Sequence, residues 1–365
     1  MIKNLPKNRF AAIVALFISL LMPTVAKAQE AYAVEDGTTL TFYYDDQRTN
    51  RTGTVYGINQ KREDDNYYPA WAGNDYEYND RITKVVFDAS FNDYRPSTTE
   101  NWFYNCRKIA AIEGLDNLNT ENVTNMNSMF SGCSALTTLD LLNLNTDNVT
   151  DMSNMFYGCN ALTKLNLSSF NTEKVSSMAE MFYGCNSLTE LDVTSFNTAR
   201  VTNVNFMFAS CRTLTSLDLS NFNTENVTNM KGMFIGCDAL TELDLSNFNT
   251  KKVTDIAYMF SACISLKTIY CDNTWSCDFS TYIFSDCTAL KGAVEYDENA
   301  TDVAMANPKT GYFTGEGTTA ISEINADAEG GATVIYNLNG VKMQGDLQSL
   351  PAGIYIVNGK KVIVK

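Results

Sequence analysis

The fold is decided by the stretch "NMKGMFIGCDALTELDLSNFNT", residues 229–250, because it belongs to a unit that recurs along the chain. Degenerate copies flank the main series, with "WFYNC" at 102–106 and "IFSDC" at 283–287. Repetition at a fixed period of this length predicts a solenoid of about eight stacked turns. Six segments of the main series open with an Asn-Thr pair, each 26 residues after the one before: Asn119, Asn145, Asn171, Asn197, Asn223 and Asn249.

Each copy combines two hydrophobic spacings. Leu240, Leu243 and Leu245 match the L-x-x-L-x-L strand of a leucine-rich repeat. Earlier in the copy, apolar residues are separated by three, three, one, three and three positions, a spacing that places them on one face of a helix. The predicted fold class is therefore α/β, a leucine-rich-repeat solenoid in which a strand and a short helical return repeat every 26 residues or so. Since one unit cannot bury its apolar face alone, the core forms when neighbours stack.

The segments around the repeats predict further parts. Residues 1–28 have the pattern of a signal peptide, with a basic start, the apolar run "FAAIVALFISLLMPTV" and a small-x-small cleavage site at its end. Residues 29–91 alternate apolar and polar side chains like strands, and predict an N-terminal cap over the open end of the solenoid. The repeats and a C-terminal cap then occupy residues 92–314, and "GEGTTAIS" (315–322) has the composition of a linker.

Residues 323–365 have a different pattern from the repeats. Asn339-Gly340 and Asn358-Gly359 each separate two runs of alternating apolar residues, which is the strongest short-range signal of a β-hairpin. Two hairpins in so short a segment predict a small C-terminal β-sandwich module.

The charge balance limits the partners. The chain has 42 acidic and 27 basic side chains, and four of the basic ones lie in residues 1–28, which leaves 23 after cleavage. Such a polyanion repels nucleic acid and anionic membrane surfaces, whereas basic partners and divalent cations are permitted. No stretch after residue 28 is apolar enough to span a bilayer. We therefore expect an exported protein with no nucleic-acid partner and no transmembrane segment after signal cleavage.

The composition also argues against catalysis. The chain has no histidine, the residue that most often performs general acid–base work, so Ser-His and Cys-His nucleophile pairs cannot form. A carboxylate pair such as Asp218 with Asp244 would lie on a repeating surface with no sign of a pocket. We expect a protein that is not an enzyme and that carries no cofactor and no resident metal ion.

Two resemblances accompany these patterns. The repeat "LDLSNFNTENVTNMKGMFIGC" resembles the BspA-like leucine-rich repeats of bacterial surface proteins, and the resemblance covers about residues 31–314. The segment "VIYNLNGVKMQGDLQSLPAGIYIVNGKKVIVK" resembles the C-terminal sorting domain of the type IX secretion system. Together they imply a Gram-negative protein that is attached to the outer membrane or secreted. They further imply contact with the secretion machinery and binding of host or microbial macromolecules.

The recurring cysteines are predicted to be buried core thiols. Equivalent side chains of stacked repeats point the same way, whereas a disulfide needs converging Cβ atoms. Cys271 and Cys277 leave this column and align with core positions of the final turns, where either a small disulfide staple or two further buried thiols is possible. The column comprises Cys106, Cys133, Cys159, Cys185, Cys211, Cys237, Cys263 and Cys287.

Two columns of strand residues are the candidate binding surface. Because strand side chains alternate between faces, residues beside the inward leucines should line the exposed concave face. Aligned carboxylates repel one another, so a basic ligand or a calcium ion would stabilise them, unless polar neighbours solvate them adequately. One column is Asp140, Asn166, Asp192, Asp218, Asp244 and Tyr270, and the neighbouring one includes Lys164, Glu190 and Glu242.

Three functions are consistent with this reading. The first is adhesin-like binding of host extracellular or bacterial surface proteins through the concave face. The second is a structural surface or matrix component that self-associates. The third is carbohydrate binding, for which Tyr270 and Trp275 are the obvious aromatic candidates. The Asn-Thr pairs are expected to be structural, with asparagine side chains bonding the backbone of the next turn.

Overall fold

The computed structural model describes residues 28–315, 335–337, 342–343, 353–357 and 360–364 of the chain. The predicted signal peptide before residue 28 and nearly all of the predicted linker lie outside the described residues. So do the two Asn-Gly pairs of the C-terminal segment. Within the described ranges, no helix is long and apolar enough to cross a membrane.

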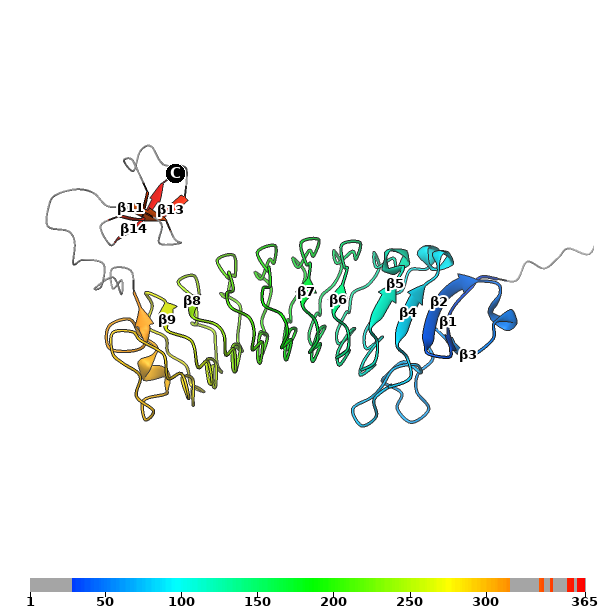
Figure 1. Cartoon of the computed structure of the whole chain (residues 1–365), viewed down its shortest axis with the longest axis horizontal. Coiled ribbons are helices and arrows are strands. Elements are labelled where there is room, and N and C mark those ends of the chain that lie inside the picture. Colours follow the sequence, from blue (N-terminus) through cyan, green and yellow to red (C-terminus); the bar gives the residue numbers. More distant parts are fainter. Residues whose placement is uncertain (1–27, 316–334, 338–341, 344–352, 358–359, 365) are drawn as a thin grey trace, which may run out of the picture.

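The N-terminal part of the stack is a five-stranded sheet with the order β3-β1-β2-β4-β5 (Figure 1). Strand β1 pairs antiparallel with β2 and β3, whereas the pairs β2–β4 and β4–β5 are parallel. The antiparallel hairpin therefore lies at the end of a run of parallel strands. The strands are β1 (Glu30–Asp36), β2 (Thr39–Asp45), β3 (Thr54–Gly57), β4 (Lys84–Phe87) and β5 (Ala111–Glu113).

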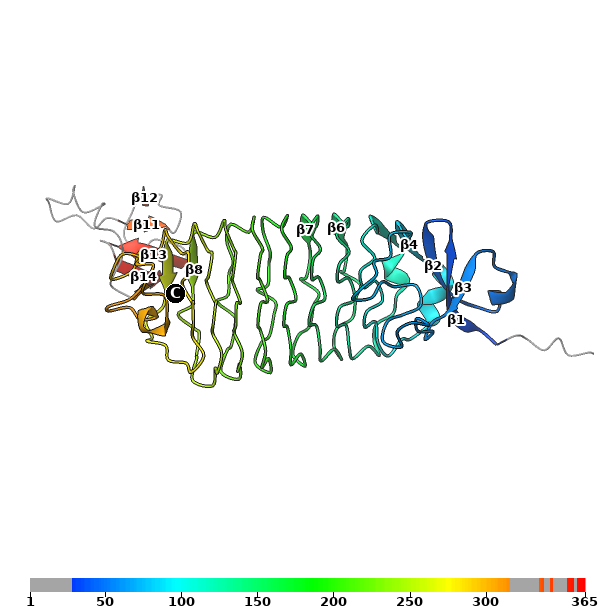
Figure 2. The ribbon, with the colours of Figure 1, turned by 90° about the horizontal axis from the view of Figure 1, so that it is seen from below.

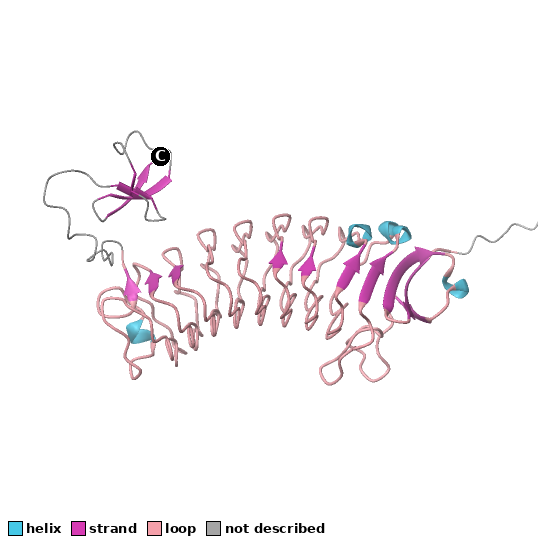
Figure 3. Cartoon of the chain, viewed as in Figure 1, coloured by secondary structure: helices cyan, strands magenta, loops and turns pink. Residues whose placement is uncertain are grey.

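Each repeat that follows forms one turn of the stack, which we call a coil. The coils carry only short parallel strands, and Figure 3 shows most of the stack as loops and turns. Four coils form the predicted strand, whereas the equivalent segments 191–193 and 217–219 are not regular strands. The short strands are β6 (Thr138–Leu139), β7 (Lys164–Leu165), β8 (Glu242–Asp244), β9 (Thr268–Tyr270) and β10 (Phe313–Thr314). We call the exposed side that carries β6–β9 the strand edge.

Successive coils lie side by side in a long, gently arched row (Figures 1 and 2). The register between coils is clearest in a line of isolated parallel β-bridges, which join equivalent residues of neighbouring coils. From Asn125 to Asp255, successive bridged residues are 26 positions apart. The members of this line are Asn125, Asp151, Ser177, Asn203, Asn229 and Asp255.

The predicted helical return is wrong. Within the described residues no α-helix is present, and the helical turns are four short 3-10 segments outside the returns: η1 (Arg48–Asn50), η2 (Ala89–Asp93), η3 (Leu115–Asn117) and η4 (Val303–Met305). The return of each coil, with the pattern Met-x-x-Met-Phe-x-x-Cys, is instead a series of tight turns. We call the side of the stack formed by these segments the return edge.

The hydrogen bonds of one return explain this difference. The N–H groups of Ser128 and Phe130 donate to Ser153 and Met155 of the next coil, at 2.9 and 3.0 Å. The intervening N–H group of Met129 donates three residues back, to Met126. Because alternate N–H groups bond across coils, they are not available for the i to i−4 bonds of an α-helix. Tandem turns repeat apolar residues at spacings of three and four, as one helix face does, so the pattern alone does not separate the two structures.

The turns also require two left-handed backbone positions in every coil. One precedes the second methionine, as at Ser128 (φ 56°) and Asn154 (φ 57°), and the other precedes the cysteine, as at Gly132 (φ 75°). Left-handed residues break a helix and favour glycine and asparagine. At Gly232 (φ 56°) a Cβ would lie 2.2 Å from Cε1 of Phe206, so glycine also leaves room for that ring.

The core runs the length of the stack as a ladder of phenylalanines. Neighbouring rings lie 5.5–5.8 Å apart between centroids and are nearly parallel. The N-terminal sheet closes the ladder with an aromatic cluster in which Phe42 packs on Phe87, Trp71 and Trp102. The ladder contains Phe103, Phe130, Phe156, Phe182, Phe208, Phe234, Phe260 and Phe284, and each of these rings is buried.

The described strands near the C-terminus pair antiparallel in the order β12-β11-β13-β14. Strands therefore flank both Asn-Gly pairs, as the hairpin signal predicted. They form one sheet, and a sandwich needs two facing sheets, so the predicted β-sandwich is wrong for the described strands. The strands are β11 (Ile335–Asn337), β12 (Lys342–Met343), β13 (Gly353–Val357) and β14 (Lys360–Val364).

Candidate functional site

The strand edge carries both predicted columns on the surface. Asp140, Asn166, Asp192, Asp218, Asp244 and Tyr270 are all exposed, as are Lys164, Glu190 and Glu242. The parallel register places Glu242 beside Thr268 and Asp244 beside Tyr270. Burial, followed by the nearby Glu242 and Asp244 charges, raises the pKa of the Tyr270 hydroxyl. The columns thus form a continuous exposed strip in which side chains of adjacent coils are neighbours.

The aspartate column also has a structural role that the sequence reasoning did not assign. Each carboxylate, and Asn166 likewise, accepts the backbone N–H two residues further on and closes a local turn. Asp192 accepts the N–H of Thr194 at 2.9 Å and its hydroxyl at 2.6 Å, and these bonds lower the pKa of the Asp192 carboxyl. The carboxylates are therefore partly satisfied by their own turns.

The sequence left a calcium ion open only as an alternative for this column, and the described residues form no preassembled site for one. Among the residues that the structure describes, no three acidic or cysteine side chains come together in a way that could hold a metal ion. The physical reason is that each aspartate directs an oxygen to its own backbone rather than to the neighbouring coil.

The cysteine column consists of free thiols that are also hydrogen-bond donors. The Cys185 thiol lies 3.3 Å from the carbonyl oxygen of Phe156 in the preceding coil, and the contact recurs from Cys133 to Cys287 at 2.9–3.3 Å. The same carbonyl of Phe156 accepts the Cys159 N–H within its own coil. Burial raises the pKa of these thiols, to about 12 for Cys159 and Cys211. Buried protonated thiols are poor nucleophiles, so this column is structural.

No disulfide links Cys271 and Cys277 in the structure, where both are free thiols. Cys271 lies 3.6 Å from the carbonyl oxygen of Asn273, and Cys277 lies 3.4 Å from that of Val253. Of the two alternatives for this pair, the structure has separate thiols, with Cys271 buried and Cys277 half-buried.

The Asn-Thr pairs are structural, but the residue that joins the coils is the threonine. Thr172 is buried, its hydroxyl donates to the Asn197 carbonyl at 3.0 Å, and it accepts the Asn197 N–H at 2.7 Å. The Asn171 side chain accepts the N–H of Glu173 in its own turn and donates to the Asp147 carboxylate of the preceding coil at 2.8 Å. The expectation that the asparagine side chain bonds the backbone of the next turn is therefore corrected for this pair, because the threonine hydroxyl makes that bond.

Of the two aromatic candidates for carbohydrate contact, Trp275 is ruled out by burial. Its side chain is 3% exposed and packs edge-on against Phe313 at 4.9 Å, so it belongs to the C-terminal core. Tyr270 is 38% exposed on the strand edge, but the residue beside it on the same side is the charged Asp244 rather than another ring.

A group of tyrosines on the return edge was missed by the sequence reasoning. Tyr67 and Tyr68 come from the long loop between β3 and β4, and Tyr104 and Tyr157 come from the first and third return segments. The Tyr68 and Tyr104 rings lie 4.6 Å apart, and Tyr67 meets Tyr68 edge-on at 5.0 Å. With the neighbouring coils they line an open cleft of about 480 Å³, which we call the tyrosine cleft.

Polar side chains complete the cleft. Asn101, Ser128, Asn154 and Glu180 occupy the left-handed position of four successive coils, and all four line the cleft. Asn101 is only 2% exposed, yet its Nδ2 group has no hydrogen-bond acceptor. It is nevertheless close enough to the Tyr67 hydroxyl to act on the pKa of that group. A buried unpaired amide donor costs free energy, so this group is suited to an acceptor that a ligand supplies.

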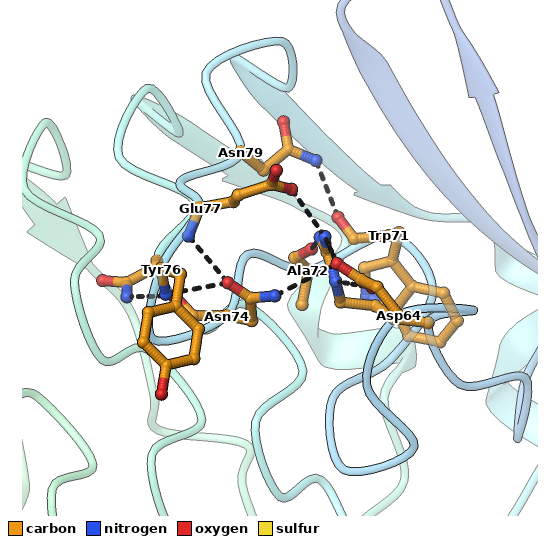
Figure 4. Close-up of polar contacts among 9 residues, drawn as sticks. Asp64, Trp71, Ala72, Asn74, Tyr76, Glu77 and Asn79 are labelled. Carbon is orange, nitrogen blue, oxygen red and sulfur yellow. Dashed lines mark hydrogen bonds and ion pairs between the residues drawn. The ribbon is translucent and has the colours of Figure 1, made fainter.

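The loop that presents Tyr67 and Tyr68 is fixed by an ionic network. The Arg62 guanidinium bonds Asp64 at 2.7 Å, Glu77 at 2.8 Å and the Ala72 carbonyl at 2.9 Å. Figure 4 shows Asn74 accepting the N–H groups of Tyr76 and Glu77, with Asn79 bonded to the Trp71 carbonyl. The N–H of Arg62 also bonds the Tyr68 carbonyl at 3.0 Å. The cleft wall is therefore held in place before any ligand binds.

The cleft is neutral to acidic. Its tyrosines stay protonated, since burial and the acceptor Asp75 raise the pKa of Tyr104 to about 12, and burial and the acceptor Glu100 raise that of Tyr67. Burial also raises the pKa of the Glu180 carboxyl. Within the described chain, neither lysine nor arginine is among the residues that line the cleft. The arrangement therefore offers aromatic faces, hydroxyls, amides and one carboxylate.

A protein-family model matches residues 97–216 and 186–296, which together span more than half of the chain. The chain belongs to the DUF285 family. The description of that family is "Mycoplasma protein of unknown function". No curated protein matches this DUF285 chain.

Two solved structures resemble the DUF285 chain. A leucine-rich repeat protein from Bacteroides ovatus is 18% identical, with a TM-score of 0.28 over 64% of this chain and 69% of the other. A leucine rich cell surface protein from Faecalibacterium prausnitzii is 17% identical, with a TM-score of 0.24 over 74% of this chain and 97% of the other. Both TM-scores lie below 0.5, so the likeness contributes nothing to the function proposed below.

One feature of the repeat sequence could have predicted the tyrosine cleft. The position after Phe in Met-Phe-x-x-Cys is small or aliphatic in most coils, as at Ser131 and Ala209, but is tyrosine at 104, 157 and 183. Large aromatics confined to one end of a regular column mark a local feature of the surface. The loop that adds Tyr67 and Tyr68 has no repeat to align with, so its position could not be read from the pattern.

Proposed function

We propose that the chain is a non-enzymatic exported surface protein that binds host extracellular or bacterial surface proteins through the strand edge. The observation that carries the proposal is a column of exposed side chains whose chemistry changes from coil to coil at one position of the repeat. Its members in successive coils are Thr138, Lys164, Glu190, Ser216, Glu242 and Thr268, and each precedes an inward leucine or isoleucine of its coil. A scaffold specifies where such positions lie, and their side chains specify the partner.

The charge of this surface favours basic partners. Glu190 and Glu242 add to the exposed aspartates of the neighbouring column, and the chain as a whole has a net charge of −15. A surface of one sign accelerates encounter with a partner of the opposite sign and excludes nucleic acid. This supports a basic protein surface as the partner class.

Charge reversal on the strand edge tests the proposal. Glu190→Lys with Glu242→Lys leaves the aspartate turns intact, and we expect it to reduce capture of immobilised basic extracellular-matrix proteins at least about tenfold. The matched control is Glu173→Lys with Glu225→Lys, which changes charge equally at two exposed turn residues of other columns. Equal loss in both variants would mean that only net charge matters, and would refute a strand-edge contact.

The structural alternative is tested in the same preparation. Concentration-dependent polymers in sedimentation velocity, together with no capture of any matrix or bacterial surface protein, would favour a self-associating surface component. A monomer that captures a basic partner supports the binding proposal.

The export route is a separate part of the proposal, and it rests on the two resemblances. We expect deletion of residues 323–365 to leave the chain in the periplasm. Cell fractionation with surface proteolysis measures this. Unchanged surface display of the truncated chain would refute sorting by the C-terminal segment.

A further inference from the structure

We propose that the tyrosine cleft binds a neutral oligosaccharide, with Tyr67 and Tyr157 as stacking faces and Asn101 as a buried hydrogen-bond donor. The inference goes beyond the proposed function and rests on it in one respect, namely that the chain meets glycans at a cell surface. The cleft lies on the return edge, so it is a separate site from the strand-edge columns.

The aromatic geometry is the first argument. The Tyr67 side chain is 52% exposed at the rim, and Tyr157 is half-buried and stacks on Tyr183 at 4.7 Å. The apolar C–H faces of a pyranose ring pack against exposed aromatic faces. Small-molecule sites combine such aromatic walls with a few fixed polar groups. The Tyr67 hydroxyl is already bonded to Glu100 at 2.9 Å, which fixes the ring.

The buried Asn101 amide, which neighbours the Tyr67 hydroxyl, is the second argument. Asn101 is almost fully buried, lines the cleft, and has an Nδ2 group without an acceptor. Its backbone is tied down, because its N–H bonds the Asn127 carbonyl at 3.0 Å. A buried donor left without a partner costs roughly 1–3 kcal/mol. A sugar hydroxyl is an acceptor of suitable size, and a small shift of the Asn101 side chain toward the cleft on binding would let it donate and remove this cost.

The charge of the cleft selects the class of sugar. Glu180 and the nearby Glu100 and Asp75 are acidic, and no basic side chain lines this part of the described chain. Sialic acids, uronic acids, sulfated sugars and phosphates would therefore be repelled. Hydroxyls of a neutral sugar can donate to the Glu180 carboxylate and accept from Asn101, so the lining matches both halves of their hydrogen bonding.

The size of the cleft favours an oligosaccharide over a monosaccharide. The lining residues span four coils from Asn101 to Glu180, and the volume is about 480 Å³. Four parallel neighbours at strand spacing of about 4.8 Å cover roughly 14 Å, the length of about three pyranose units. An open groove of this length admits a chain that extends beyond it at both ends.

The test uses the purified full-length protein on an array of neutral and acidic glycans, followed by calorimetry with maltotriose, cellotriose and chitotriose. Tyr67→Ala and Tyr157→Ala should each weaken binding about tenfold through loss of a stacking face. Asn101→Asp keeps the size of the side chain but removes the donor, and should weaken binding similarly. Tyr282→Ala is the matched control, since Tyr282 is 54% exposed on the return edge outside the cleft.

Binding of neutral trisaccharides that the cleft variants weaken and the control retains supports the proposal. Absence of binding to every neutral glycan overturns it, as does binding that Tyr67→Ala and Tyr157→Ala leave unchanged, or a preference for anionic glycans. A thermal melt of each variant shows whether the fold is intact, and Tyr67→Phe, which keeps the ring, should retain binding. Capture of a basic protein without sugar binding would refute this inference and leave the proposed function standing.

Discussion

The two edges of the same coil differ in what their residues do. On the strand edge, the exposed aspartates each close a turn of their own backbone, and their neighbours differ in charge from coil to coil. On the return edge, the backbone is bonded between coils, and a few tyrosines interrupt a column of small residues. The strand edge thus offers a long, charged strip, whereas the return edge offers the tyrosine cleft at its N-terminal end.

This difference shows where functional positions should be sought in a repeat protein. Residues that recur in every coil are mostly engaged in holding the coils together, as Thr172 and Cys185 are. Residues that depart from their column, such as Tyr157 or Lys164, have no such duty and can serve a partner. The predictions below separate the recurring residues from the departing ones.

The largest effect should come from the phenylalanine ladder on the return side. Phe182 is fully buried and lies between Phe156 and Phe208, so Phe182→Ala should lower the free energy of unfolding by about 3–5 kcal/mol. Phe279→Ala, at a 67% exposed ring, is the control and should change it by less than about 0.5 kcal/mol. Urea unfolding measures both, and equal costs would contradict the ladder as the core.

An intermediate effect should come from the Asn-Thr junction. Thr172→Val keeps the shape but leaves the N–H and carbonyl of Asn197 without the hydroxyl, at a cost of about 2 kcal/mol. Thr163→Val removes a single exposed bond to the Thr137 carbonyl and should cost less than about 0.5 kcal/mol. If the two variants melt at the same temperature, the threonine does not join the coils as described.

The smallest effect should come from the aspartate turns of the strand edge. Asp192→Ala should cost about 1 kcal/mol, whereas Asp192→Asn keeps an acceptor oxygen and should cost less. The pKa of Asp192 is lowered in the folded chain, so its contribution is complete above the ordinary aspartate pKa near 4 and is lost as pH falls through the lowered pKa of the folded state. The stability difference between the wild type and Asp192→Ala should be smaller at pH 3 than at pH 7, and an undiminished gap at pH 3 would refute the role.

Much of the architecture was accessible from the sequence. The strand position is confirmed where β8 contains Leu243, and the Cys133–Cys287 column is buried and free as predicted. The structural role of the Asn-Thr pairs is also confirmed, although through the threonine. These features depend on which side chains are buried and on how side chains alternate between faces, and the spacing of apolar residues in the sequence indicates both.

Neither the turn structure of the return segments nor the tyrosine cleft could be predicted from the sequence, for reasons that particular residues show. Spacings of three and four residues are shared by a helix face and by tandem turns, and the deciding feature is a left-handed residue such as Asn154, which no apolar pattern reports. Tyr67 reaches the cleft from a loop outside the repeats, more than thirty residues before Tyr104. Trp275 seemed an exposed candidate because its burial depends on packing against Phe313, a contact remote in sequence.

The most direct test of the account is an NMR titration of the full-length protein with ring-labelled tyrosine. Tyrosines occur in the cleft (Tyr67, Tyr104, Tyr157), on the strand edge (Tyr270) and at the far end of the return edge (Tyr282), so one experiment compares these surfaces. With cellotriose, maltotriose or chitotriose, we expect shifts at the cleft tyrosines and none at Tyr270 or Tyr282. Shifts at Tyr270 with an unchanged cleft, or no shift with any of the three sugars, would contradict it.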